Sequence, residues 1–383
     1  FEEIGFYAPS AKGQMEFHSL SQLIPKPYRT FDEVWKIHKT PDGIVFQSFR
    51  YIFLYYNNKI TVIRPRSSFT YSYFVGNKLL VIDKDNGLFE VTPGGLKFRN
   101  NNPLFQRDEI KCILQAGPGQ LLIGTFNNGL YKLEGNTLSQ WGSDLNKELV
   151  ENGLFSGIRL ENGFYAFGTI RNGLYIADEN GMIYQHLNRQ KGLQNNTILS
   201  LYEDKRHNLW IGLDNGIDYL ELNSPLSIFN YTYNIESTYS TIEYQGKLYA
   251  GTNQGLYTID MNKLSNRHLD QKFDLIKGTE GQVWSLTIVD DQLLCGHNYG
   301  CFLIEGSKST KISDIPGFWK FIEYNGSVDT LLAGTYNGLV KLIRDGRSWK
   351  VDAKVKGFTE SCRFLEQDTD GSIWIAHGYR GLF

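Results

Sequence analysis

A short phrase recurs along the chain about every 40 residues, and it constrains the fold more than any other feature. Each copy is an apolar run ending in Gly-Thr or a close variant, a short loop, and then Gly-Leu-Tyr or a near copy. Clear copies are 121–125 followed by 128–131, and 165–169 followed by 172–175. Further copies of the first half of the phrase lie at 209–213, 248–252, 293–297, 331–335 and 373–377.

The spacing of these copies indicates the kind of repeat. The second glycine of each copy stands at 87, 129, 173, 216, 255, 300, 338 and 381, so successive intervals run from 38 to 45 residues. One interval holds β-rich runs at 198–202, 209–213 and 217–222, with 227–231 as a possible fourth strand. No stretch keeps a helical period, so we expect almost no helix. The sequence predicts an all-β fold, a β-propeller of four-stranded antiparallel blades of about 40 residues each.

The regular spacing of the repeat also suggests domain boundaries. A proline and a polar stretch interrupt the repeat at 223–225, which predicts a first propeller over 1–226 and a second over 227–383. Residues 1 to 20 resemble the outer strands of a blade whose inner strands lie upstream, and Phe383 stops inside a blade. We therefore expect both propellers to be incomplete, the first at its N-terminus and the second at its C-terminus. The alternative is one closed ring of nine blades, above the usual range.

Composition excludes several classes of partner. The net charge is −2 with interspersed signs, so we expect no bound nucleic acid and no contact with an anionic membrane by this segment. No apolar run is long enough to span a membrane. Four cysteines are too few for a disulfide scaffold and match no zinc motif, so we expect no metal and no cofactor. Cys295 and Cys301 flank one predicted hairpin and could pair, although free buried thiols are the simpler interpretation.

The combination of strand, Asp/Asn-Gly turn, Trp-Ile-Gly-Thr and Asn-Gly-Leu resembles the two-component-regulator propeller repeat. It is most similar to Bacteroidetes regulators that carry a triple-tyrosine domain, a membrane helix and a LuxR-type helix-turn-helix output, and to related hybrid two-component sensors. The stretches that carry the resemblance are 31–37, 46–49, 163–169, 188–226, 281–284, 355–358 and 373–382.

The resemblance implies a ligand-sensing ectodomain built from two propellers in tandem. It implies a periplasmic location and a membrane anchor in segments outside this sequence. The implied ligand is a small glycan or its breakdown product, and the implied output is transcription regulation. We expect a homodimer in the full-length protein. The competing interpretations are a carbohydrate-active propeller enzyme and a protein-interaction scaffold.

Two copies of the phrase suggest a binding site. Most copies place threonine where the loop begins, but two place histidine, each followed by a tyrosine. A histidine beside a tyrosine could bind a sugar or respond to pH, or it could simply replace threonine in a hydrogen bond to the turn. The candidate ligand-binding residues are His297, Tyr299, His377 and Tyr379.

Other features favour structure over chemistry. The tryptophans on predicted strands are expected to pack in the core and between blades; they are Trp35, Trp210, Trp284, Trp319 and Trp374. The stretch 368–374 is similar to the Asp-box turn of sialidases, which is structural even there. No motif supplies a nucleophile, a metal or a phosphate-binding loop. The sequence therefore predicts a binding protein with no catalytic residues.

Overall fold

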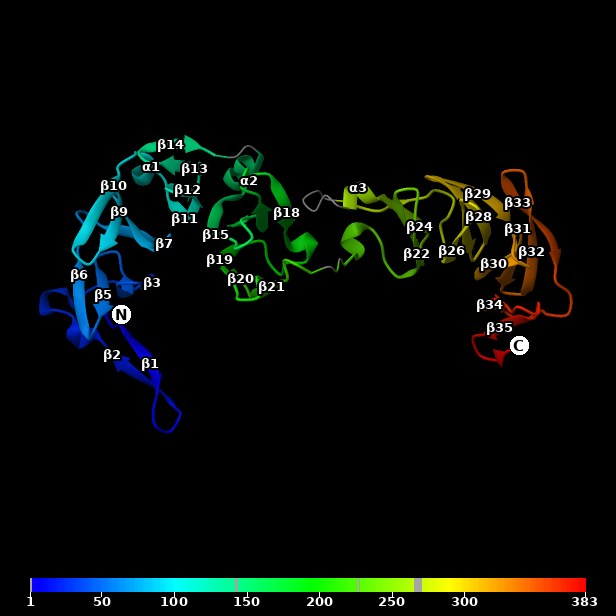
Figure 1. The fold of residues 1–383 in the computed structure, drawn as a ribbon, viewed down its shortest axis with the longest axis horizontal. Helices are drawn as coiled ribbons and strands as arrows, with labels where there is room; N and C mark the ends of the chain where they lie inside the picture. The colour runs from blue at the N-terminus through cyan, green and yellow to red at the C-terminus, as the bar shows by residue number, and fades with distance from the viewer. Residues whose placement is uncertain (1, 142–143, 225, 227, 265–270) are drawn as a thin grey trace. The chain divides into compact units, whose positions relative to one another are not determined.

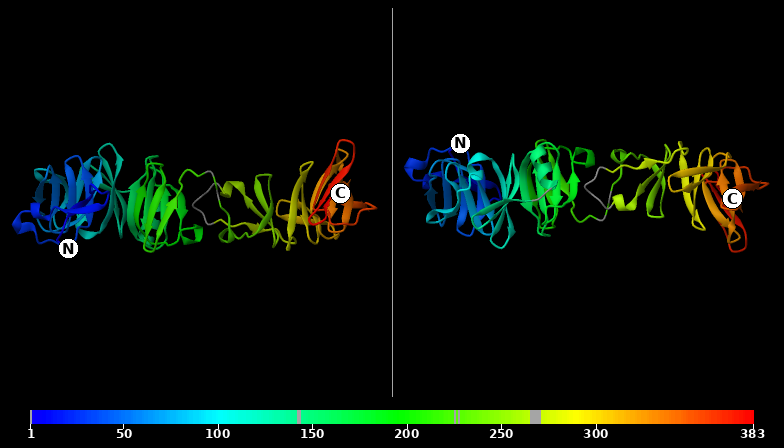
Figure 2. Two further views of the ribbon diagram at one scale, coloured as in Figure 1. Left: turned by 90° about the horizontal axis from the view of Figure 1, so that it is seen from below. Right: turned by 90° about the horizontal axis from the view of Figure 1, so that it is seen from above.

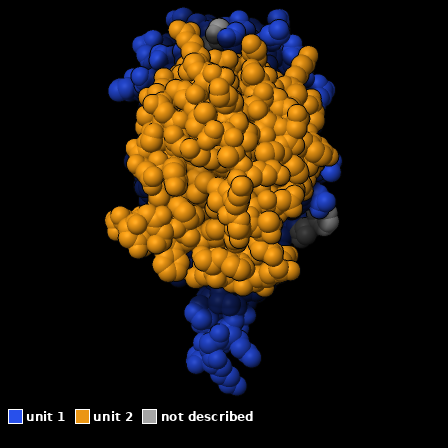
Figure 3. All heavy atoms as spheres, turned by 90° about the vertical axis from the view of Figure 1, so that its right-hand side faces the viewer, with its two compact units in different colours: residues 1–224 blue, residues 225–383 orange. Residues whose placement is uncertain are grey.

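The computed structural model describes residues 2–141, 144–224, 226, 228–264 and 271–383, and most of their regular structure is antiparallel strand (Figure 1). The chain divides into two compact units, which we call unit 1 (residues 1–224) and unit 2 (residues 225–383) (Figure 3). This division falls two residues before the boundary that the sequence suggests. Whether each unit is an incomplete propeller of its own, and whether 1–226 and 227–383 are the right limits, stay predictions.

Unit 1 begins with an isolated hairpin and continues with five sheets in which each strand pairs with the next along the chain. Its strands are β1 (Gly5–Pro9) and β2 (Met15–Ser19), then β3 (Lys36–Thr40), β4 (Gly43–Gln47), β5 (Ile52–Tyr56), β6 (Lys59–Ile63), β7 (Phe69–Val75), β8 (Lys78–Asp83), β9 (Gly87–Thr92), β10 (Gly95–Asn100), β11 (Ile110–Gly117), β12 (Gln120–Thr125), β13 (Gly129–Glu134), β14 (Thr137–Gln140), β15 (Leu154–Arg159), β16 (Tyr165–Thr169), β17 (Leu174–Ala177), β18 (Ile183–Leu187), β19 (Ile198–Glu203), β20 (Leu209–Leu213) and β21 (Ile217–Leu220).

Unit 2 holds four sheets of the same kind. Its strands are β22 (Thr238–Tyr244), β23 (Lys247–Thr252), β24 (Leu256–Asp260), β25 (Asp274–Leu275), β26 (Val283–Val289), β27 (Gln292–His297), β28 (Gly300–Glu305), β29 (Lys308–Ser313), β30 (Lys320–Tyr324), β31 (Ser327–Thr335), β32 (Gly338–Asp345), β33 (Ser348–Lys354), β34 (Phe364–Gln367), β35 (Ile373–His377) and β36 (Gly381–Leu382).

Helices are short, as the sequence predicts. The described helices are α1 (Leu104–Arg107), α2 (Asp144–Asn152), α3 (Met261–Leu264) and the 3₁₀ turns η1 (Ser21–Leu23), η2 (Lys26–Tyr28), η3 (Arg189–Lys191) and η4 (Tyr231–Tyr233). The strand suggested at 227–231 was wrong for the described residues 228–231, which are irregular up to η4. Polar Asn230 accounts for this, because its side chain accepts the backbone N–H of Thr232 and begins η4.

The sheets of each unit follow one another as propeller blades do (Figure 2). The first strands of consecutive sheets contact one another, namely β3, β7, β11, β15 and β19 in unit 1 and β22, β26, β30 and β34 in unit 2. The first strands are therefore the inner ones, which line the axis of a propeller. The predicted all-β propeller architecture is confirmed.

The Gly-Thr pair of the repeat has a separate physical reason for each residue. A Cβ on Gly124 would lie 2.6 Å from a methyl group of Leu154 in the next sheet, so only glycine lets the two sheets approach. The hydroxyl of Thr125 donates to the carbonyl of Gly129 at 2.9 Å and accepts the backbone N–H of Asn128 at 3.0 Å. This threonine closes the loop between the second and third strands.

Apolar clusters fill the space between consecutive sheets. Leu122 and Leu130 of one sheet pack with Leu154 and Phe167 of the next, and all four are fully buried. The first sheet of unit 1 has no sheet before it, and residues 4–34 cover that face through side chains such as Phe31. The hairpin β1–β2 pairs with no other described strand, so its assignment to a blade that begins upstream stays a prediction.

The last sheet of unit 1 leaves one face bare, which corrects the expectation for the tryptophans. Tyr202, Trp210 and Tyr219 lie side by side across β19–β21, and Trp210 is 45% exposed. The corresponding row of the preceding sheet contains Ala166, which is buried against β19–β21. Trp210 was wrongly assigned to the core because no further sheet of unit 1 covers this row. Trp374 on the last sheet of unit 2 is 54% exposed for the same reason.

Trp374 is held by the Asp-box turn that the sequence suggests at 368–374, and Trp210 is held by an equivalent turn at 204–210 that the sequence analysis did not single out. The indole N–H of Trp374 donates to the Asp368 carboxylate at 3.2 Å, and that of Trp210 donates to Asp204 at 3.1 Å. These carboxylates also accept backbone N–H groups of their own turns. The turn is therefore structural in both sheets.

Candidate ligand-binding site

The predicted site residues lie where the second and third strands of two sheets of unit 2 are joined. His297 ends β27 and His377 ends β35, and a tyrosine follows two residues after each. Tyr299 is 62% exposed and Tyr379 is 99% exposed. The rings of each pair are close, with centroids 5.6 Å apart for His297–Tyr299 and 6.5 Å for His377–Tyr379. The sheet β30–β33 separates the two pairs in the strand order.

His297 takes over the work of the threonine that it replaces. Its Nδ1 accepts the backbone N–H of Tyr299 at 3.0 Å, and its Nε2 lies 3.2 Å from the carbonyl oxygen of Thr279. These partners fit a neutral ring protonated at Nε2. Burial lowers the pKa of His297, and a positive charge on Lys311 acts in the same direction. The ring is 1% exposed, so only Tyr299 of this pair offers a surface to a ligand.

His377 closes its turn in the same way. Its Nδ1 accepts the backbone N–H groups of Tyr379 at 3.0 Å and Arg380 at 3.2 Å. Its Nε2 lies 4.0 Å from the carboxylate of Glu360, which is also paired with Arg380. Both histidines therefore have a structural task. The role of His297, Tyr299, His377 and Tyr379 in ligand binding stays a prediction.

A second feature at the same end of the sheets was not foreseen. The first strand of most sheets carries a β-bulge just after its start, and the bulged residue precedes the partner of the second-strand glycine. Tyr239 precedes Ser240, the partner of Gly251, and Trp284 precedes Ser285, the partner of Gly296. A bulge turns a side chain out of the regular alternation of a strand.

In unit 2 the residues at this position form a continuous series of side-chain contacts. Tyr239 and Trp284 lie at bulges, whereas Trp319 and Arg363 stand directly before β30 and β34, at the corresponding position without a register shift. We call the four residues before the partners of Gly251, Gly296, Gly334 and Ala376 the bulge arc; they are Tyr239, Trp284, Trp319 and Arg363. The ring centroids are 5.1 Å apart for Tyr239–Trp284 and 4.4 Å for Trp284–Trp319, and the Arg363 guanidinium lies 5.2 Å from the Trp319 ring.

The bulge arc lies near the loops that hold the predicted tyrosines. The first residue of β26, Val283, pairs with His297, so the start of this inner strand and the loop after β27 share one end of the sheet. Tyr336, in the equivalent loop of the next sheet, accepts the indole N–H of Trp284 at 2.9 Å. Burial raises the pKa of Tyr336, so its hydroxyl stays protonated and keeps a hydrogen to donate.

The sequence contained a signal for this arc. An aromatic residue stands after the buried residue that starts the inner strand in Gln-Val-Trp-Ser at 282–285 and Gly-Phe-Trp-Lys at 317–320. The expectation of inter-blade packing is correct for Trp284 and Trp319, which contact each other from adjacent sheets. Trp35 lies just before β3 and contacts Tyr71 of the next sheet, so it also packs between sheets, although at 46% exposure it is not in the core.

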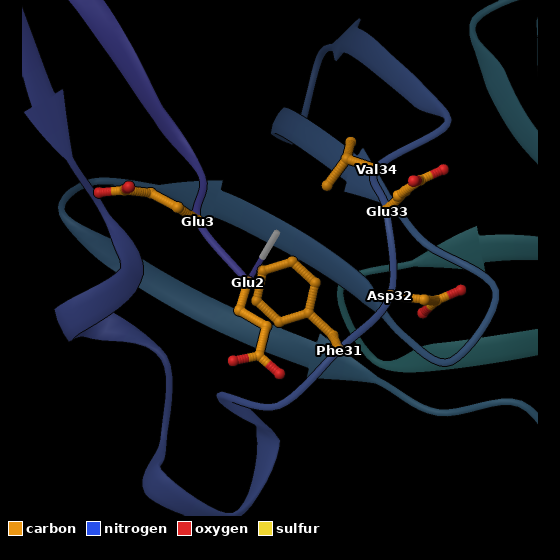
Figure 4. Close-up of a pocket in the computed structure, with 6 residues that line it drawn as sticks. All are labelled: Glu2, Glu3, Phe31, Asp32, Glu33 and Val34. Carbon is orange, nitrogen blue, oxygen red and sulfur yellow. The ribbon is translucent and has the colours of Figure 1, made fainter.

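A hollow in unit 1 lies away from the arc. It measures about 250 Å³ and is lined by Glu2, Glu3, Phe31, Asp32, Glu33 and Val34 (Figure 4). The glutamate side chains point in different directions rather than toward a common point (Figure 4). The Asp32 carboxylate accepts the backbone N–H groups of Phe49 and Arg50, which gives it a structural role.

Metal-binding clusters and membrane-spanning helices are absent from the part of the chain that the structure describes. Within the described residues, no group of three or more His, Cys, Asp or Glu side chains could hold a metal ion. The described helices include none that is long and apolar enough to cross a membrane. The four cysteines are free and buried, and burial raises the pKa of each thiol, to about 12 for Cys112 and Cys362. Cys295 and Cys301 are therefore unpaired and poorly nucleophilic.

Comparisons with known proteins agree with the repeat. Residues 192–215 match the family model described as "Two component regulator propeller". The extracellular domain of a hybrid two-component system from B. thetaiotaomicron gives a TM-score of 0.66 at 18% identity, covering 98% of this chain and 52% of that chain. The extracellular domain of a one-component system from the same organism gives 0.41 at 16% identity, covering 91% and 53%. A search of curated proteins found no match.

The chain spans about half the length of these solved structures. The higher-scoring of the two shares the propeller fold with this chain. The resemblance to the two-component-regulator propeller repeat, inferred above, is confirmed by the family model over residues 192–215.

Proposed function

We propose that this chain is the ligand-sensing propeller segment of an extracytoplasmic regulator, and that it binds a glycan or its breakdown product without transforming it. The observation that carries the proposal is the bulge arc, a row of aromatic side chains at the end of unit 2 where the second-to-third-strand loops also lie. Aromatic rings with polar neighbours are the usual lining of small-molecule sites. The family match supports a sensory role.

The side chains around the arc suit binding better than catalysis. The arc and its loops contribute tyrosine, tryptophan, histidine and arginine. Of these, His297 is neutral and engaged in its turn. The cysteine thiols are buried with raised pKa values, so they offer no activated nucleophile. We therefore propose a sensor rather than a carbohydrate-active enzyme.

The remaining parts of the proposal concern the longer protein. We propose a periplasmic location, an inner-membrane anchor and a transcriptional output in segments other than this one, and a homodimer as the signalling form. Ligand binding would act by favouring one arrangement of propellers or subunits over another, which requires different affinities for the two.

The test uses the purified 383-residue chain and a panel of oligosaccharides. Calorimetry measures binding, and chromatography of the same mixtures measures product release. We expect at least one oligosaccharide to bind and to be recovered intact. Product release that disappears when a carboxylate pair is replaced would establish an enzyme instead. Binding of a protein partner with no response to any oligosaccharide would favour a scaffold.

A further inference from the structure

The bulge arc ends in an arginine whose charge has no carboxylate partner. The Arg363 guanidinium lies 5.2 Å from the Trp319 ring centroid and 5.7 Å from that of Phe364, and the residue is exposed. Within the described residues, no hydrogen bond or ion pair engages it. Arg380 of the same sheet differs, because its guanidinium is 2.6 Å from the Glu360 carboxylate. An exposed arginine held over aromatic rings is positioned to bind an anion.

The carboxylates nearest in sequence do not neutralise Arg363. Glu366 is paired with Lys320, and Glu360 is paired with Arg380. Each of these acidic side chains therefore already has a cation of its own. The positive charge of Arg363 remains available at the end of the arc.

The charge at the end of the arc decides which kind of ligand the arc favours. Trp284 lies between Tyr239 and Trp319, with interplanar angles of 48° and 33°, and Trp319 lies between Trp284 and Arg363. A cation that approached the Trp319 ring would meet the Arg363 guanidinium already 5.2 Å from its centroid. The arc therefore favours an anion over a quaternary ammonium group.

Two further groups extend the site. The Tyr336 ring lies 5.3 Å from Trp319, and its hydroxyl has a hydrogen to donate beside the arc. At the other end, Tyr239 is 49% exposed and has a sheet neighbour on only one side within the arc. A tyrosine in this position can stack on the apolar face of a sugar ring.

We infer that the bulge arc binds an acidic oligosaccharide, with its carboxylate or sulfate on Arg363 and Tyr336 and a neighbouring sugar ring against Trp284 and Tyr239. The inference rests on the proposed sensory function and specifies the ligand class of that site. A carboxylate and a sulfate share the same recognition chemistry here, so the probes must separate them.

The experiment measures calorimetric affinity of the full chain for three probes of equal length: an oligogalacturonate, a sulfated oligosaccharide and a neutral oligosaccharide. We expect one acidic probe to bind at least tenfold more tightly than the neutral one, and the tighter acidic probe identifies the anion. The Arg363→Gln substitution should lower the affinity of the chain for that acidic probe about tenfold or more, because a charge-assisted hydrogen bond is lost. Raising the salt concentration should weaken binding by the parent more than by Arg363→Gln.

Controls separate this inference from the function on which it rests. Arg380→Gln removes a charge from the same sheet outside the arc and should leave affinity unchanged. Trp284→Phe keeps a ring in the arc if Trp284→Ala fails to fold, and Tyr239→Ala tests the sugar-stacking end. Acidic binding that survives Arg363→Gln, or a preference for the neutral probe, would overturn the inference while leaving glycan sensing intact. Failure of all three probes to bind a folded chain would overturn the inference, and the wider panel would then judge the proposed function.

Discussion

Unit 1 and unit 2 place different residues at the start of their inner strands, just before the partner of the second-strand glycine or its equivalent, a position that is bulged in some sheets and regular in others. In unit 2 the position holds Tyr239, Trp284, Trp319 and Arg363 in unbroken contact. In unit 1 it holds Trp35, Lys111, Phe155 and Leu199 in four of the five sheets, and in the other sheet Tyr71 lies within the irregular stretch of β7.

The cationic side chain at this position in unit 1, Lys111, also differs from Arg363 in its ion pairing and in its exposure. The Lys111 ammonium lies 4.7 Å from the Phe155 ring and 5.1 Å from the Phe126 ring, and it is paired with Glu109 at 2.6 Å. Its side chain is only 10% exposed, whereas Arg363 is exposed and unpaired within the described residues. The comparison teaches that this inner-strand position belongs to the scaffold and that the residue placed on it decides which contacts and which charge it presents.

The largest effect should come from breaking the scaffold that both units share. Gly173 in unit 1 and Gly300 in unit 2 have φ of 78° and 139°, and a Cβ would overlap the carbonyl oxygen of Leu187 or Ser313. Replacing either by valine should lower the free energy of unfolding by about 3 kcal/mol, through strain and backbone overlap. Denaturant unfolding measures the loss.

Two other glycines give a graded control. Gly129 has φ of 77°, but its Cβ would meet the side chain of Asn146 rather than a backbone carbonyl, so its valine variant should lose about 1–2 kcal/mol, part of it from disturbing the hydrogen bond between Asn146 and the Leu130 N–H. Gly135 has open space around it, and Gly135→Ala should show conformational strain alone. Equal stability of all four variants and the parent would contradict the shared turn geometry.

A smaller loss of stability should distinguish the tryptophan contacts at this position in unit 2 from those in unit 1. Trp319 contacts Trp284, Tyr336 and Arg363, so Trp319→Ala should cost about 2 kcal/mol of stability. Trp35 is 46% exposed and contacts Phe49 and Tyr71, so Trp35→Ala should cost about 1 kcal/mol. Thermal melts of both variants test the order, and a larger loss for Trp35 would reverse the comparison.

Acid should expose a difference at the threonine position of the loop. One sheet of unit 1 has buried Asp83 there, whereas other sheets have threonine, such as Thr125 in unit 1 and Thr252 in unit 2. Burial alone would raise the pKa of Asp83, but hydrogen bonds from Ser67, Asn86 and the Arg66 backbone outweigh it and hold the pKa low.

The sign of the acid effect follows from this lowered pKa. The ionised carboxylate stabilises the fold above the unfolded pKa of about 4, and this contribution is lost as the pH falls through the folded pKa. Asp83→Asn should therefore destabilise by about 1–2 kcal/mol at pH 7 and by much less at pH 3. Urea unfolding at the two pH values measures both differences. A penalty that is the same at pH 3 would show that the charge is not involved.

The sequence predicts the sheets well because their signals are local. The glycine that admits the next sheet and the threonine that closes the loop are both set within a few residues, as Gly124 and Thr125 show. Whether a tryptophan is buried depends on neighbouring sheets rather than on the local sequence. Trp210 and Ala166 occupy the same row of their sheets. Ala166 is buried because another sheet of unit 1 follows its own, and Trp210 is exposed because none does.

The candidate site likewise contains features that the local sequence predicts and features that only the structure reveals. The histidines attracted attention because they depart from threonine, yet the structure engages their ring nitrogens in the turn. Trp284 and Trp319 fit the repeat, so sequence reasoning assigned them to packing. Their series of contacts depends on the bulge, which the residue pattern alone does not reveal.

The smallest effect should come from His297, whose ring does the work of a threonine. His297→Thr restores the hydroxyl found at Thr252 and Thr335, which donate to the carbonyls of Gly255 and Gly338. At pH 7.5 the variant should melt within a degree or two of the parent. Its affinity for ligand should change less than twofold, because the ring is buried and only Tyr299 is exposed.

Lowering the pH should reveal a difference in thermal stability between the parent protein and the His297→Thr variant. Burial lowers the pKa of His297 below its usual 6.5, with Lys311 acting in the same direction and Glu280 against it. The neutral ring therefore stabilises unit 2 above pH 6.5, and this contribution is lost as the pH falls toward the folded pKa and below it. The parent should lose more thermal stability than His297→Thr between pH 7.5 and pH 5. Identical pH profiles would contradict a lowered pKa for His297. A tenfold loss of affinity at constant melting temperature would instead place the imidazole in contact with ligand.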